Sequence, residues 1–204
     1  MIKQTAYLFL ISGTLAMASC GGSGKDGDKK NDSTTQSTSA APVPKMTINE
    51  SDWVAKDLST VSNLTPVTVK LPKDAKMEKN GNGGVDIHVS DWYDITVSNN
   101  ASSSVADAMK DDKTITVDHQ GHQDGKVVID EPNGFVYTYT LKTEENGTKY
   151  QPESHFVYYV EKDGAIYSFE SVRPQSNFFV PGSAYTLDLA KQVYNIIKSS
   201  AKAN

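Results

Sequence analysis

Two strand-like segments joined by Asp163-Gly164 constrain the fold of this chain more than any other feature. Residues 156–160 and 165–169 are rich in aromatic and β-branched side chains, and Asp-Gly between such segments is a strong signal for a two-residue β-hairpin. The turn imposes a register that pairs Lys162 with Ala165, Val160 with Tyr167, and Tyr158 with Phe169. Because bulky side chains then pair on one face, the sequence predicts an antiparallel hairpin with a buried side.

Three further regions have the alternating pattern of strands. Residues 67–71 alternate and stop at Pro72. Residues 85–97 are predicted to fold back near Trp92, and a three-residue loop would pair Val89 with Ile95 and Ile87 with Val97. Residues 126–130 and 135–141 flank a turn at 131–134. These strands extend the predicted hairpin into a larger antiparallel sheet.

Two helices account for much of the remainder. Ser102 or Ser103 is predicted to cap a short helix that carries Val105, Ala106, Ala108 and Met109. A second helix is predicted to begin near Ser183 or Thr186 and to end at about Ser200. Its apolar stripe contains Leu189, Val193, Ile196 and Ile197. The sequence therefore predicts an α+β fold, in which both helices pack on an antiparallel sheet.

The order of these elements resembles that of the PsbP-like extrinsic photosystem proteins, and of small bacterial lipoproteins with a similar fold. The similar segments are Val-Thr-Val-Lys-Leu-Pro-Lys-Asp-Ala at 67–75, Val-Asp-Ile at 85–87, Ile-Asp-Glu-Pro-Asn-Gly-Phe-Val-Tyr at 129–137, the Asp163-Gly164 hairpin and the C-terminal helix. The resemblance covers most of residues 66–200. It implies a non-catalytic accessory or adaptor protein and identifies no functional residues.

The N-terminus has the pattern of an export signal that ends at Cys20, the only cysteine. Lys3 precedes the apolar run 6–11, which is too short to span a membrane. Leu-Ala-Met-Ala-Ser-Cys at 15–20 resembles the lipobox of bacterial lipoproteins, in which the cysteine is lipidated and the preceding segment is removed. Ala-Met-Ala at 16–18 also fits ordinary signal peptidase, which would leave Cys20 as a free thiol. Lipidation is the preferred interpretation, because an unpaired thiol is poorly suited to an oxidising compartment.

Three regions follow from this interpretation: a lipoprotein signal peptide at 1–19, a lipidated cysteine with a flexible polar tether at 20–45, and a single α+β domain at 46–204. Gly21 stands where lipoproteins retained at the inner membrane usually carry Asp. We therefore expect lipid anchoring to the outer membrane. Some bacteria export lipoproteins to the cell surface through acidic residues just after the cysteine. Asp26 and Asp28 match this signal only in part, because Gly27 separates them and Lys25 precedes them, so a periplasmic and a cell-surface orientation both remain open.

The charge of the chain excludes one class of partner. Its formal net charge is −5, and Arg173 is the only arginine. Nucleic-acid binding domains instead carry clustered basic side chains. We therefore expect no nucleic-acid partner and no electrostatic attachment to anionic lipid.

Two groups of residues are candidate sites. Asp118, His119, His122 and Asp124 share a Gly-containing segment and are weak candidates for metal ligands. The simpler interpretation is a polar loop, so no metal or other cofactor is expected. Trp92 and Tyr93, at the predicted hairpin tip, are candidates for ligand contact through exposed rings, or else belong to the core.

The sequence contains none of the familiar nucleophile-elbow, phosphate-loop or zinc-protease motifs. The preferred expectation is a non-enzymatic, envelope-anchored lipoprotein whose domain binds an unknown envelope protein or small ligand. The alternative is a surface lipoprotein that binds glycan or host material through aromatic side chains. A metal-binding protein or enzyme that uses residues 118–124 is a more distant third.

Overall fold

The computed structural model describes residues 45–143, 147, 149–174, 176 and 183–204. They belong to one contact unit, which spans residues 40–204. Within them the chain forms an α+β fold with antiparallel sheets and two α-helices, as the sequence predicts.

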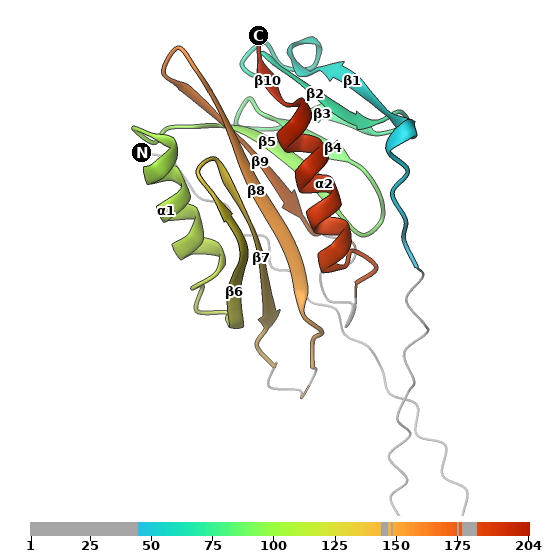
Figure 1. Ribbon diagram of the computed structural model, residues 1–204, viewed down its shortest axis with the longest axis vertical. Helices are drawn as coiled ribbons and strands as arrows, with labels where there is room; N and C mark the ends of the chain where they lie inside the picture. The colour runs from blue at the N-terminus through green and yellow to red at the C-terminus, as the bar shows by residue number, and fades with distance from the viewer. Residues whose placement is uncertain (1–44, 144–146, 148, 175, 177–182) are drawn as a thin grey trace, which may run out of the picture. The chain divides into compact units, whose positions relative to one another are not determined.

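A seven-stranded antiparallel sheet dominates the described part of the chain, with strand order β3-β4-β5-β9-β8-β7-β6 (Figure 1). Its strands are β3 (Lys76–Lys79), β4 (Val85–His88), β5 (Asp94–Asn100), β6 (His122–Glu131), β7 (Gly134–Leu141), β8 (Glu153–Lys162) and β9 (Ala165–Val172). The β8–β9 hairpin lies in the interior of this order, so each of its strands has a neighbour on both edges.

A second, three-stranded sheet has the order β1-β2-β10. Its strands are β1 (Trp53–Asp57), β2 (Val67–Pro72) and β10 (Lys202–Ala203), and short 3-10 helices at Glu50–Asp52 and Leu58–Thr60 flank β1. The C-terminal strand pairs with β2 through Lys202 opposite Thr68 and Ala203 opposite Val67. The two ends of the folded region therefore meet in one small sheet.

The predicted β8–β9 register is confirmed. Its pairs are Lys162 with Ala165, Val160 with Tyr167, and Tyr158 with Phe169. Asp163 and Gly164 both have positive φ, 53° and 78°. A two-residue turn with two positive φ values has the twist that joins antiparallel strands tightly, and Asp-Gly tolerates it.

The predicted fold-back between residues 85 and 97 is present, but its register was wrong by two residues. Ile87 pairs with Ile95 and Val85 with Val97, and the connection runs from Val89 to Tyr93. The Ser90 hydroxyl accepts hydrogen bonds from the backbone N–H groups of Trp92 and Tyr93, at 3.2 and 3.3 Å. This side-chain turn widens the loop, and a shift of two residues keeps every side chain on its predicted face.

The two helices cover opposite faces of the large sheet to different extents. Helix α2 (Leu187–Ser200) is capped by Thr186 as predicted, and its buried stripe is Leu189, Ala190, Val193, Tyr194, Ile196 and Ile197. Helix α1 (Val105–Thr116) is capped by Ser104, one residue beyond the predicted caps, because the Ser104 hydroxyl accepts from the Asp107 N–H at 3.1 Å. It buries only Ala108 and Met109.

Alternation along the strands divides the core in two. The larger cluster contains Phe156 and Phe169 with the α2 stripe, and the smaller one contains Val157 and Tyr159 with Ala108 and Met109 of α1. Neighbouring residues of β8 therefore point to opposite helices, as the two-residue period of a strand requires. In the described residues, neither helix is long and apolar enough to cross a membrane.

Gly134, the first residue of β7, provides a test of this packing. A Cβ atom there would lie 2.6 Å from the Val157 carbonyl oxygen and 3.0 Å from the Tyr194 ring. Gly134→Ala is therefore expected to lower the free energy of unfolding by about 1–3 kcal/mol, measured by urea denaturation. Gly81→Ala is the control, because nothing lies within 4 Å of its Cβ position. Equal stability of the two variants would contradict the packing of α2 against β7.

Candidate functional site

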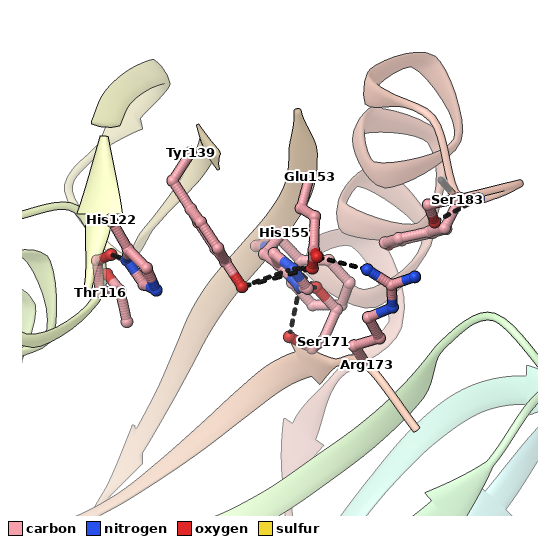
Figure 2. A network of polar contacts seen from close by, with 10 residues as sticks. Thr116, His122, Tyr139, Glu153, His155, Ser171, Arg173 and Ser183 are labelled. Atoms are coloured by element: carbon pink, nitrogen blue, oxygen red, sulfur yellow. Dashed lines mark hydrogen bonds and ion pairs between the residues drawn. The ribbon is translucent and has the colours of Figure 1, made fainter. Parts of the chain in front are cut away.

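A cluster of buried polar side chains lies where β8 begins and where β7 and β9 end (Figure 2). We call it the Glu153 network, and its members are Tyr139, Glu153, His155, Ser171 and Arg173. Buried ionisable groups with specific partners are common at functional sites, although structural ion pairs have the same signature. The network is therefore a candidate functional site within the described residues.

Glu153 is the centre of the network. Its carboxylate accepts a hydrogen bond from Arg173 Nη1 and lies 3.3 Å from His155 Nε2. The side chains of Glu153 and Arg173 are 5% exposed, and that of His155 is 6% exposed. Burial alone would raise the pKa of Glu153. The hydrogen bond and charge of His155 together with those of Arg173 outweigh it and hold this pKa below its usual value.

The backbone of β9 fixes the ring of His155. Its Nδ1 lies 3.0 Å from the carbonyl oxygen of Ser171, which can only accept, so Nδ1 carries the proton of this bond. The Ser171 hydroxyl accepts from the Phe156 N–H at 2.9 Å. Tyr139 Oη lies 3.4 Å from Glu153 Oε2, and burial raises the pKa of this phenol. The network thus joins the ends of β7, β8 and β9.

A stack of rings extends from the network toward β6. Tyr139 lies parallel to His155, with ring centroids 5.4 Å apart, and parallel to His122, with centroids 3.7 Å apart. His122 Nδ1 lies 2.6 Å from the Thr116 carbonyl oxygen at the end of α1. Burial lowers the pKa of His122, which favours its neutral form. The stack therefore ties the C-terminal end of α1 to the network.

The contacts of the Glu153 network hold neighbouring strands together. The carboxylate of Glu153 is shared by Arg173, His155 and Tyr139, and the His155 ring is bonded on both sides. All of these contacts are made within the domain, between side chains and backbone groups at the ends of β7, β8 and β9. The Glu153 network therefore acts as a clamp on the strand ends.

The structure brings together part of the predicted metal-ligand group. His119 and His122 have ring centroids 4.8 Å apart, and His119 Nδ1 accepts from the Gly121 N–H. Asp118 and Asp124 are exposed, and Asp124 has a positive φ of 56°. Within the described ranges, no three His, Cys, Asp or Glu side chains are arranged to hold a metal ion.

The two aromatic candidates have different environments. Tyr93 is 2% exposed and stacks on Tyr185, with centroids 4.2 Å apart, so its ring belongs to the core and not to a ligand-contacting surface. Trp92 is half-buried and packs against the same core. Cys20, the predicted lipidation site, lies outside the described residues.

Glu153 and Arg173 were not predicted as site residues, although the sequence holds a signal for their pairing. If the β8–β9 register is continued past Val157 opposite Glu170, residue 153 falls beside residue 174. The only arginine of the chain is therefore expected next to a glutamate at the end of the hairpin. Extending a predicted register to the charges beyond it would have revealed this pair.

Comparisons with known proteins yield a likeness of fold. No known family model and no curated protein matches the sequence. Among solved structures, the solution structure of cyanobacterial PsbP (CyanoP) from Synechocystis sp. PCC 6803 matches with a TM-score of 0.40 and 10% sequence identity. The match covers 81% of this chain and 99% of that chain. At this low identity, the structural resemblance concerns only the arrangement of the chain.

The clamp can be tested by removing its charges singly and together. Arg173→Met leaves Glu153 buried without the guanidinium beside it and is expected to cost about 3–5 kcal/mol in the free energy of unfolding. The double variant Glu153→Gln/Arg173→Met removes both charges, so we expect it to be more stable than Arg173→Met in urea denaturation.

Lys113→Met is the control, because its partner Asp130 is 59% exposed and such pairs contribute about 1 kcal/mol or less. If the losses in the free energy of unfolding caused by the changes at positions 153 and 173 simply add in the double variant, the two side chains are not coupled. That result would contradict the clamp.

Proposed function

We propose that this chain is an outer-membrane lipoprotein whose folded domain binds an envelope partner or ligand and performs no chemistry. The observation that carries the proposal is the lipobox-like segment that ends at Cys20, together with the polar tether that follows it. Lipid attachment of this kind holds a domain at a bilayer without any membrane-spanning segment. The domain is then free to contact partners within the reach of its tether.

The Glu153 network supports the non-catalytic half of the proposal. It is the most deeply buried set of charged groups in the described part of the chain, and its charges are directed at one another. Structural ion-pair networks have this form. The partner would then contact the surface of the scaffold.

Glycan contact through paired exposed rings has less support than this binding role. Tyr93 stacks inside the core, so only the half-buried Trp92 remains near that loop. Sugar-binding platforms need the face of a ring to be accessible, because stacking uses that face. The proposal therefore keeps an envelope protein or a small ligand as the partner.

Replacing the anchor tests where the domain is held. The Cys20→Ser chain is expected to be recovered in the soluble envelope fraction with an unchanged circular dichroism spectrum. The original chain should pellet with membranes and gain the mass of its acyl groups. Ser23→Ala, a change in the tether, should leave the membrane fraction unchanged. A Cys20→Ser chain that still pellets with membranes would contradict the lipid as the sole attachment.

Binding itself is tested by crosslinking in intact envelopes. The lipidated chain is expected to yield discrete crosslinked products that the soluble Cys20→Ser chain gives more weakly, because tethering raises the local concentration of the domain. The absence of any specific crosslinked protein or copurified small molecule would overturn the proposed binding role.

A further inference from the structure

A hollow of about 620 Å³ lies between α1 and the turn that joins β6 to β7. In Figure 1, α1 runs beside β6 along the margin of the large sheet. The α1 side of the hollow consists of residues one helical turn apart, and the opposite side is the β6–β7 turn. Its lining is Ala106, Met109, Lys110, Lys113 and Thr114 from α1, Asp130 and Glu131 from the end of β6, and Pro132 from the turn. The hollow is shallow and open to solvent, so a bound molecule would lie along its floor.

Part of the lining is apolar. Ala106, Met109 and Pro132 present carbon atoms to the hollow, and the aliphatic stem of Lys113 adds to them. The Lys113 ammonium lies 5.4 Å from the centroid of the Phe135 ring, which is buried beneath α1. Because α1 buries only Ala108 and Met109, its remaining side chains on this flank are available to a ligand.

The charged side chains of the lining determine which charge the polar head group of a ligand must carry. Lys113 pairs with Asp130 at 2.7 Å, and Glu131 accepts from Lys198 at 2.6 Å and from Tyr194 at 2.8 Å. Lys110 is exposed, and its ammonium makes no hydrogen bond or ion pair within the described residues. Lys110 also acts electrostatically on Asp107, one turn earlier on α1, without forming an ion pair with it. A ligand that enters the hollow therefore meets one positive charge, that of Lys110, which no ion pair of the described residues holds.

We propose that this hollow binds a small amphiphile, with its anionic head group on Lys110 and its apolar body along Ala106, Met109 and Pro132. The inference rests on the proposed binding role and names the chemical class of one ligand. A carboxylate with a medium-length alkyl chain has the required chemistry, since burial of its methylenes favours binding and Lys110 fixes its orientation.

Isothermal titration of the full Cys20→Ser chain with decanoate tests this inference without detergent. One decanoate is expected to bind per chain, and decylamine is expected not to bind because its head group carries the wrong charge. Lys110→Ala should weaken decanoate binding about tenfold, which is the loss of one charge-assisted contact. Ala106→Trp should abolish binding by filling the hollow from an exposed helix position.

Lys70→Ala is the matched control, since Lys70 is an exposed lysine on β2. It should bind decanoate as the parent chain does, and thermal unfolding checks that each variant is folded. Absence of decanoate binding, unchanged binding in the folded Lys110→Ala or Ala106→Trp variant, or equal binding of decylamine would overturn the inference.

The two proposals fail in distinguishable ways. If the crosslinking described above finds a partner while decanoate does not bind, the ligand class is wrong and the binding role stands. If decanoate binds as expected while no envelope protein is crosslinked, the hollow is a small-ligand site and protein docking is overturned.

Discussion

The β8–β9 hairpin is the constraint on which the rest of this fold depends. It lies inside the large sheet, and its strands are covered on both faces. Alternate residues of β8 point to opposite faces of the sheet, and both faces are apolar. Each face must therefore be buried by its own helix, whereas a strand with a single apolar face would need only one such helix. Phe156 meets the α2 side and Val157 meets the α1 side, so this strand specifies a three-layer arrangement of helix, sheet and helix.

The two helices differ in how much of their surface is buried against the sheet, and this difference bears on function. Helix α2 contributes a continuous buried stripe, whereas α1 buries only Ala108 and Met109, with Val105 partly buried beside them, and adds several polar contacts. Asp112 accepts from the Tyr159 hydroxyl, Lys113 pairs with Asp130, and the Thr116 carbonyl meets His122. The incomplete cover leaves the hollow beside α1 at the β6–β7 turn, and the Glu153 network lies at the other end of β7. The scaffold is thus tight on the α2 side and accessible on the α1 side.

Elements defined by local chemistry were predictable from the sequence. The Asp163-Gly164 turn set the β8–β9 register, and the apolar stripe with Thr186 defined α2. The β4–β5 register was missed because the Ser90 hydroxyl organises a wider loop, and no residue pattern distinguishes pairings that differ by two. The short strands β3 and β10 carry no strand-like alternation; β3 forms a local hairpin with β4, whereas β10 forms because it meets the distant strand β2. The Glu153–Arg173 pair likewise depends on tertiary placement.

Native-state hydrogen exchange tests the central role of the hairpin most directly. The amides of β8 and β9 are expected to exchange only through global unfolding, with the free energy measured by urea denaturation. The amides of α1 are expected to exchange at a lower free energy, through local opening, because two buried side chains hold that helix less firmly than the hairpin is held. Protection of α1 equal to that of β8, or exchange of β8 and β9 ahead of global unfolding, would contradict this account.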